Sequence, residues 1–259
     1  MVFLIRRDQE TDNYLFGNGP CAPKSRLSWI SSDNEEQFEQ NQRDPRKRRM
    51  LEQAGWTSTS IRYHINDRGF RMDRDMRDLE PGNGILYLGC SLTFGVGLNI
   101  EDTWAHLHHQ KQGGDFINLA WPATGIDTQY RMLAAWAGVL RPPRAYTLGA
   151  FPERRELIRP DGIARFGPWT NGRDAEIYHM MIEDDREVRM TFLRAVDAMR
   201  AICCDHGIEL YAPGDGVMGM VNQPQGGQDE RLARDLMHRG PAWHQRMASI
   251  AGDQWQRLA

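Results

Sequence analysis

The sequence has no long apolar run, and it has no marked excess of charge of one sign. No segment of its 259 residues approaches the roughly 20 consecutive apolar residues that a membrane-spanning helix needs. The opening MVFLIRRDQE places only a short apolar run before two arginines, too short for a signal-peptide core. Its 32 basic and 35 acidic residues favour neither nucleic acid nor an anionic membrane. We expect a soluble, unexported chain, cytoplasmic or associated with an assembly, with no membrane span and no nucleic-acid partner.

Cysteine is also scarce. The four cysteines are Cys21, Cys90, Cys203 and Cys204, and two of them are adjacent, unlike the dense disulfide framework of a small secreted module. A reducing compartment is therefore the better expectation. With 40% hydrophobic and 26% charged residues, disorder, collagen and coiled coil are excluded as descriptions of the whole chain. The length predicts one large domain, or one domain with an appendage.

The first 55 or so residues are polar and show no apolar pattern sufficient for a core of their own. The basic cluster Arg46 to Arg49 is most simply a solvated helix or linker face, with binding of nucleic acid or a partner as the alternative. Alternation from Thr59 to Tyr63, followed by the turn residues Asn66 to Gly69, predicts a small β-element. We expect three parts: an N-terminal extension (1–58), this β-element and linker (59–83), and the main domain (84–259).

Short, nearly continuous apolar runs alternate with helical patterns from Gly84 onward. Such runs are typical of parallel strands buried on both faces. They begin near Gly84, Asp115, Ala145 and Ile208, and the intervening helices are expected over 102–111, 127–138 and 185–206. The alternation predicts an α/β fold with a mainly parallel sheet and helices on both faces.

The sequence predicts two helix N-caps and one long loop in this domain. The segment Glu101 to Thr103 and the residue Asp127 are candidate N-caps of the first two helices. The stretch 156–184, rich in Pro, Gly and Asp, is expected to be a long loop that acts as a lid or a substrate-facing insertion.

Ser91 follows the first predicted strand in the sequence GCSLTFGVG. In a doubly wound sheet, ligands bind beyond the carboxyl ends of the strands. A serine in a strand-to-helix turn can be a nucleophile there, but also an N-cap or a phosphate-loop residue. Near the other end of the chain, Asp235 and His238 lie three residues apart, ahead of a helix predicted to begin near Pro241. That spacing lets one loop bring an imidazole to a serine while the carboxylate orients the ring.

Taken together, GCSLTFGVG and DLMHRGPAWHQ closely resemble the SGNH, or GDSL-like, serine hydrolase family. Gly89 to Leu92 stands for the family's Gly-Asp-Ser-Leu block, and Asp235 with His238 stands for its Asp-x-x-His block. The segment Ile65 to Arg71 looks like the Asn-x-x-Gly-Phe-Arg stretch that precedes the hydrolase domain in many members. The resemblance covers roughly residues 60–251.

The resemblance implies a three-layer α/β/α, flavodoxin-like sheet of mostly parallel strands, preceded by an N-terminal extension. It also implies that Ser91 is the nucleophile, His238 the general base and then acid, and Asp235 the residue that orients His238. The Ser91 amide would contribute to the oxyanion hole.

The other two oxyanion positions of the family are altered here. In the second block, INLAWPATGID, Ala123 stands where the glycine is expected and Gly125 follows two residues later. In the third block, GAFPERRE, Gly149 matches but Phe151 replaces the asparagine. Because losing one such donor costs about 100- to 1,000-fold in turnover, an active enzyme would need a substitute.

Arg154 and Arg155 are the candidates for that substitute, since a guanidinium supplies charge-assisted donors. Glu153 or Glu156 is expected to hold the arginine in place. The alternative is a surface cluster of ion pairs.

Other residues are weaker candidates. Cys90 is a rival nucleophile, although a small buried thiol under the turn is the ordinary interpretation. Leu92, Trp121 and Trp169 are candidates for the substrate crevice. No Cys or carboxylate set completes a zinc site with the histidines at 106, 108 and 109, so we expect neither a metal nor another cofactor.

The resulting expectation is a carboxylic ester hydrolase, an esterase or deacetylase with an altered oxyanion hole. The favoured substrate, by family analogy, is a small-molecule or carbohydrate ester with a small acyl or O-acetyl group. An acyltransferase would share the triad. The alternative of another class is a catalytically weakened binding or structural protein, attached to a larger assembly through a protein partner of its N-terminal region.

Overall fold

The computed structural model describes residues 17–56, 61–159, 162–213 and 232–259. The chain opening and Thr59 therefore lie outside the described residues. The described helices are α2 (Glu35–Arg43), α3 (Pro45–Ala54), α4 (Ser91–Phe94), α5 (Trp104–Gln110), α6 (Ile126–Leu140), α7 (Arg173–Ile182), α8 (Asp185–His206) and α9 (Pro241–Asp253), with short 3-10 turns at Met76–Asp78 and Ile100–Asp102. The described strands are β1 (Arg26–Leu27), β2 (Tyr63–His64), β3 (Gly84–Leu88), β4 (Asp115–Asn118), β5 (Arg144–Thr147), β6 (Arg155–Arg159), β7 (Gly162–Phe166), β8 (Glu209–Ala212) and β9 (Gln256–Arg257).

A five-stranded sheet in the order β4-β3-β5-β8-β9 forms the centre of the molecule. The first four strands of this order are parallel, and β9 pairs antiparallel with β8 at one edge. Every residue of β3 is buried, as its unbroken apolar run predicts for a strand covered on both faces. The predicted α/β fold with a mostly parallel sheet is confirmed.

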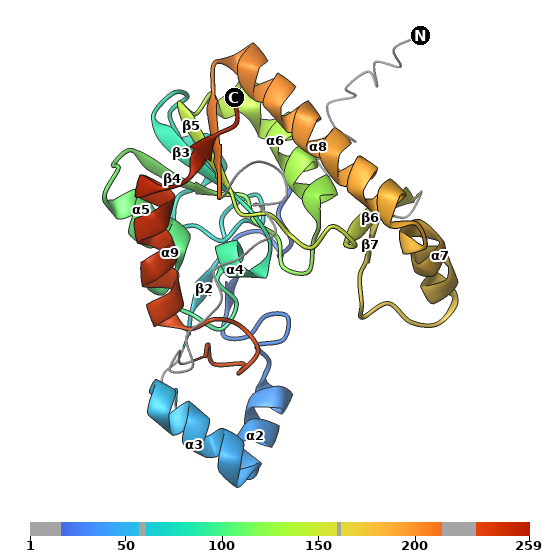
Figure 1. Ribbon diagram of the computed structural model, residues 1–259. Coiled ribbons are helices and arrows are strands. Elements are labelled where there is room, and N and C mark those ends of the chain that lie inside the picture. Colours follow the sequence, from blue (N-terminus) through green and yellow to red (C-terminus); the bar gives the residue numbers. More distant parts are fainter. Residues whose placement is uncertain (1–16, 57–60, 160–161, 214–231) are drawn as a thin grey trace.

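Helices cover both faces of this sheet, which gives three layers (Figure 1). α6 and α8 lie together on one face, and α5 and α9 lie together on the other. The apolar core is accordingly divided between the two faces. One cluster contains Leu86, Met132 and Phe192, and the other contains Tyr87, Trp104 and Trp243. No helix in the described ranges is long and apolar enough to cross a membrane.

Two local expectations were wrong. The N-cap of α6 is Gly125, not Asp127, because the Asp127 carboxylate accepts hydrogen bonds from Arg155 and the Glu156 amide. The stretch 156–184 is not a loop without secondary structure, since it contains most of the β6–β7 hairpin and the helix α7. Its role as a lid or a substrate-facing insertion stays a prediction. Thr103 does cap α5, with its hydroxyl accepting from the His106 amide.

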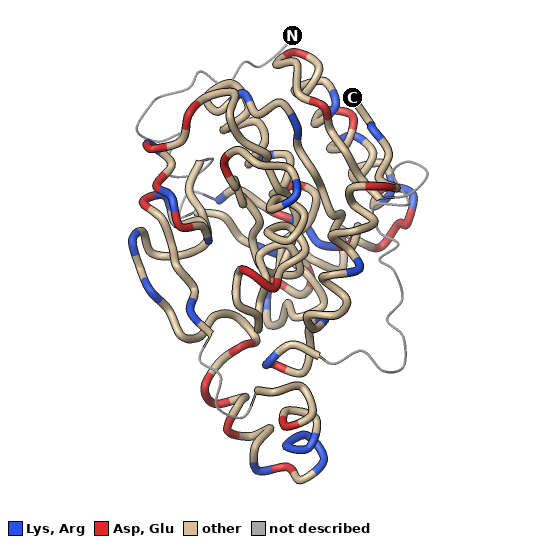
Figure 2. The backbone as a smooth tube through the Cα atoms, turned by 90° about the vertical axis from the view of Figure 1, so that its left-hand side faces the viewer, with Lys and Arg blue, Asp and Glu red and all other residues tan. Residues whose placement is uncertain are grey.

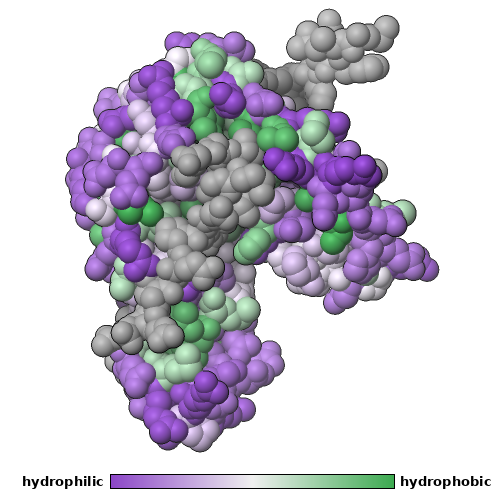
Figure 3. All heavy atoms as spheres, viewed as in Figure 1, coloured by the Kyte–Doolittle hydropathy of each residue, from purple (hydrophilic) through white to green (hydrophobic). Residues whose placement is uncertain are grey.

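The polar N-terminal part shares a core with the main domain. Leu51 and Trp56, at the end of α3, pack in one cluster with Tyr63, Phe94 and Ala233. α2 and α3 form a helical pair at one end of the molecule and carry both signs of charge (Figure 2). Hydrophilic residues cover the outer end of this pair, and hydrophobic residues gather near its junction with the rest (Figure 3). The basic cluster at 46–49 is exposed on α3.

Candidate active site

Ser91 is the first residue of α4, directly beyond the carboxyl end of β3. Ser91 is buried, with 8% of its surface exposed to solvent. A Cβ at Gly89 would overlap the Thr93 side chain, so only glycine allows the strand to turn this sharply. The first amides of a helix have no partner within it, and in the described ranges the Ser91 and Leu92 amides have no acceptor. The turn can therefore present N–H groups beside a hydroxyl.

Arg71 fixes the other end of this short helix. Its buried guanidinium donates to the carbonyls of Phe94 (3.0 Å), Gly95 (2.5 Å) and Leu98 (2.7 Å), and it lies 4.3 Å from the centroid of the Tyr63 ring. Burial lowers the pKa of Arg71 to about 10, which leaves it charged at neutral pH. The sequence does not predict this role, although Arg71 ends the segment Ile65 to Arg71 that resembles a stretch of the family.

Asp235 and His238 are joined as the sequence predicts. The Asp235 side chain is fully buried, and its Oδ2 lies 2.6 Å from His238 Nδ1. Because an ionised carboxylate can only accept, this geometry places the proton on Nδ1 and leaves Nε2 to act as a base. Burial acts to raise the pKa of Asp235, but hydrogen bonds from His238 and Ser32 outweigh it, and the net effect is a lowered pKa. The His238 side chain is 18% exposed, so solvent reaches it.

The loop that follows α4 contacts the loop of this pair. Gly97 accepts a hydrogen bond from the Arg234 amide (3.0 Å), and a Cβ on Gly97 would come within 2.9 Å of Ala233 Cβ. Ser91 and His238 thus belong to neighbouring loops, but within the described residues no hydrogen bond joins them. Such contacts are often long in the absence of substrate.

The second block adopts the conformation that its expected glycine would favour. Ala123 has φ 56°, in the left-handed region that costs a residue with a Cβ about 1–2 kcal/mol. Two residues later, Gly125 begins α6 so close to the Arg154 carbonyl that a Cβ would overlap it. The amides of Ala123 and Gly125 have no acceptor in the part of the chain that the structure describes.

The third block presents a cation between two aromatic rings. The Arg154 guanidinium carbon lies 4.9 Å from the ring centre of Phe151 and 5.2 Å from that of Trp169. Phe151 is 51% exposed and Trp169 is 44% exposed. Within the described ranges Arg154 has no ion-pair partner, and its Nε is buried without an acceptor. Of the two candidate arginines, Arg154 is therefore the one whose guanidinium has N–H donors without a described acceptor.

Neighbouring charges in this block are already paired. Arg155 Nε lies 3.2 Å from Asp127. The expectation that Glu156 is one of the two residues that could hold Arg154 is not met. It forms an ion pair with Arg131 (2.9 Å), in which each side chain is 5% exposed, and its other oxygen accepts from Thr128. The expectation for Glu156 was wrong because the β6–β7 hairpin turns its carboxylate toward α6.

The remaining candidates are placed as follows. The Leu92 side chain is buried in the core between α5, α9 and the sheet. Trp121 is partly buried, with Arg131 5.0 Å and Arg165 5.9 Å from its ring centre. Cys90 is 3% exposed and its sulfur lies 4.0 Å from Ser91 Oγ, as expected for a packed thiol.

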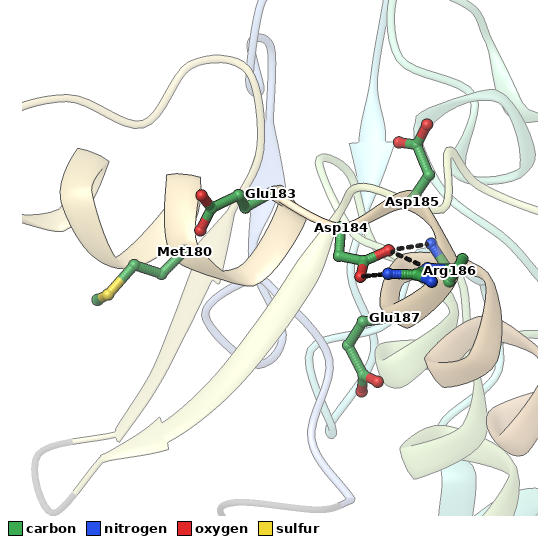
Figure 4. Close-up of a pocket in the computed structure, with 6 residues that line it drawn as sticks. All are labelled: Met180, Glu183, Asp184, Asp185, Arg186 and Glu187. Atoms are coloured by element: carbon green, nitrogen blue, oxygen red, sulfur yellow. Dashed lines mark hydrogen bonds and ion pairs between the residues drawn. The ribbon is translucent and has the colours of Figure 1, made fainter.

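Two other features of the described residues do not contribute to this site. A pocket at the junction of α7 and α8 is lined by Met180, Glu183, Asp184, Asp185, Arg186 and Glu187, and Arg186 pairs there with the neighbouring Asp184 (Figure 4). Among the described residues, no group of three His, Cys, Asp or Glu side chains could hold a metal ion.

Comparison with known proteins found no matching family model and no matching curated protein. Similar solved structures include a protein assigned to the lipolytic G-D-S-L family from Desulfitobacterium hafniense DCB-2, with 14% identity and a TM-score of 0.41 over 65% of this chain and 97% of that one. Another is TesA, with 13% identity and a TM-score of 0.40 over 64% of this chain and 94% of that one.

Proposed function

We propose that the protein is a serine hydrolase of carboxylic esters, with Ser91 as nucleophile, His238 as general base and acid, and Asp235 as the orienting carboxylate. The observation that carries this proposal is the 2.6 Å contact between His238 Nδ1 and a fully buried carboxylate, on a loop packed against the one that follows Ser91. A buried carboxylate on the far nitrogen is what a histidine needs to work as a base through Nε2.

In the proposed reaction, His238 Nε2 takes the Ser91 proton as Oγ attacks the ester carbonyl. The tetrahedral oxyanion accepts hydrogen bonds from the Ser91 amide and from the amide of Ala123 or Gly125. His238 then returns the proton to the departing alcohol, which leaves an acyl group on Ser91. Water, activated by the same histidine, releases the acid.

Arg154 is the proposed replacement for the missing side-chain amide of the third block. It follows β5 in the chain, and β5 pairs with β3, so we expect it near the edge of the sheet at which Ser91 lies. Its uncommitted donors support this role. The exposed rings of Phe151 and Trp169 beside it suit a substrate with an apolar or sugar face. Small acyl or O-acetyl esters, including those on carbohydrate, are the proposed class, and an alcohol acceptor in place of water would make the enzyme an acyltransferase.

A fluorophosphonate ester probe tests the nucleophile and the base together. Intact mass should show a single adduct on the wild type that is absent from Ser91→Ala and His238→Ala. Cys90→Ala is the matched control, since it removes the neighbouring buried nucleophile and should leave labelling unchanged.

The runner-up is a binding or structural protein that keeps the fold with a weakened site. Phe151 at the third-block position and the lack of a described Ser91–His238 hydrogen bond favour it. A wild type that is folded by circular dichroism yet stays unlabelled would contradict the hydrolase proposal and support this one.

A further inference from the structure

The segment from Ser28 to Asn34 forms a tight turn against the loop that carries the proposed base. The Ile30 amide donates to the Asp33 carbonyl (2.7 Å), and the Asp33 amide donates back to the Ile30 carbonyl (3.1 Å). Ser31 and Ser32 are therefore the two central residues of the turn, and Ser31 has φ 58°, as such turns require. Ser32 is consequently presented at the tip of a rigid hairpin.

A buried ion pair anchors this hairpin. Asp33 and Arg234 are 1% and 3% exposed, with two contacts of 2.6 and 2.8 Å between guanidinium and carboxylate. Arg234 also donates to the Ser28 carbonyl and lies 3.8 Å from the ring centre of Trp29. Tyr63 donates its hydroxyl proton to Asp33 (2.5 Å), and burial, the largest cause, raises the pKa of Tyr63. Such a buried, bidentate pair holds both of its chain segments in one geometry.

The anchor fixes the residues next to it in the chain. Ser32 precedes Asp33, and Asp235 follows Arg234, so the ion pair brings these two neighbours together. Ser32 Oγ lies 2.7 Å from Asp235 Oδ2 and 3.5 Å from His238 Nδ1. Because the carboxylate only accepts, the Ser32 hydroxyl is the donor.

Four hydrogen bonds from described residues hold the Asp235 carboxylate. Oδ1 accepts from the amides of Met237 and His238, both at 3.0 Å. Oδ2 accepts from the His238 ring and from Ser32. Ser32 and the imidazole of His238 thus share one carboxylate oxygen.

We propose that Ser32 is a positioning residue of the hydrolytic site, acting through Asp235 on His238, and that the N-terminal segment is an integral part of this site. The inference rests on the proposed function. The hydroxyl holds the carboxylate against rotation and withdraws part of its charge from His238, so the imidazole stays both aligned and less strongly stabilised in its protonated form.

Removing the hydroxyl should therefore lower kcat about tenfold with little change in KM. It should also move the acid limb of the kcat/KM profile to higher pH, because a carboxylate that no longer accepts from Ser32 attracts the imidazolium more strongly. Among the described residues, the charged groups near His238 on other packed elements include the Asp33–Arg234 ion pair and His244 of α9, whose pKa is lowered to about 3 chiefly by burial, with smaller contributions from the charges of His238 and Arg71. These groups are the same in every variant.

The experiment compares the wild type with Ser32→Ala, Ser32→Thr and Ser28→Ala, using p-nitrophenyl acetate as substrate. Ser32→Thr keeps the hydroxyl and should recover most of the rate and the wild-type acid limb. Ser28 is exposed and contributes only its backbone carbonyl to the anchor, so Ser28→Ala is the matched control and should behave as wild type. A rate loss that Ser32→Thr does not restore, or that comes with no shift of the acid limb, would overturn the inference in favour of a merely structural serine.

A second readout does not depend on activity. The Nδ1 proton of His238 should give a low-field NMR signal that His238→Ala removes, and this signal should move in Ser32→Ala but not in Ser28→Ala. An inactive wild type with this pattern would refute the hydrolase proposal while supporting the Ser32 contact. An active wild type whose signal and kinetics are unaffected by Ser32→Ala would refute the contact alone.

Discussion

At the scale of single residues, backbone conformation explains a departure from the expected motif. Ala123 occupies a left-handed position where the resembling family has glycine, and the chain tolerates it there at φ 56°. The side chain contributes nothing that this conformation needs, whereas the amide beside it is free in the described structure. The alanine in the second block therefore adds backbone strain to the loop, whereas its amide N–H can still donate a hydrogen bond.

We predict that Ala123→Gly leaves stability unchanged or raises it by up to about 1 kcal/mol, since relief of the left-handed strain outweighs or offsets the entropy that glycine adds to the unfolded chain. Ala135→Gly, in the interior of α6, is the matched control and should cost about 1 kcal/mol. Urea denaturation of both variants measures the difference. A loss at position 123 as large as that at position 135 would contradict the strain argument.

At the scale of elements, the β6–β7 hairpin is attached to the site by charges. Glu156 pairs with Arg131 of α6 where both side chains are 5% exposed, while Arg155 pairs with Asp127 nearer the surface. Arg165 of β7 donates to the Pro122 carbonyl in the second block. The hairpin thus supports the loop that carries Ala123 and Gly125.

Glu156→Ala should destabilise the protein by about 3 kcal/mol, because it leaves the buried Arg131 guanidinium without its carboxylate. Glu153→Ala, on the exposed turn before the hairpin, should change stability by less than about 0.5 kcal/mol. The two free energies of unfolding can be compared in guanidinium chloride. Equal values would mean that the buried pair does not hold the hairpin.

The strands and helices of the main domain were predictable, because their apolar runs and periodicity are strong local signals. The helix predicted over 185–206 is α8 itself, and the four predicted strands are β3, β4, β5 and β8. The hairpin in 156–184 was not predictable, since its strands mix charged and apolar residues and are only partly buried. Ser32 carries no local signal, and Arg71 is marked only as the last residue of the segment Ile65 to Arg71, which does not indicate what its side chain contacts. Their roles come from contacts with distant parts of the chain. Ser32 contacts a residue 203 positions away, and Arg71 contacts residues 23 or more positions away.

At the scale of the whole molecule, buried neutral histidines link stability to pH. His244 of α9 is 1% exposed, and its Nδ1 accepts from the Trp104 amide at the start of α5. His108 of α5 is fully buried beside Tyr87, with Nδ1 2.8 Å from the Tyr87 hydroxyl. Burial is the main cause that lowers the pKa of His244 to about 3 and that of His108 to about 4. His108 thus lies where α5 packs on the sheet, and His244 lies where α9 packs on the start of α5.

Each of these histidines titrates near its ordinary pKa of about 6.5 when the chain unfolds, so between that value and the folded pKa the unfolded state binds more protons. The contribution of these histidines to the free energy of unfolding should therefore be complete above about pH 6.5. It should fall as the pH drops toward 4, by up to about 1.4 kcal/mol per pH unit for each histidine. His244→Asn, which keeps an acceptor for the Trp104 amide, should remove the contribution of His244 to this slope between pH 6 and pH 4.5. His179→Asn, on the exposed side of α7, should leave the slope as it is. Urea unfolding at a series of pH values measures it, and a His244→Asn slope equal to that of the wild type would show that α9 does not dock through a neutral histidine.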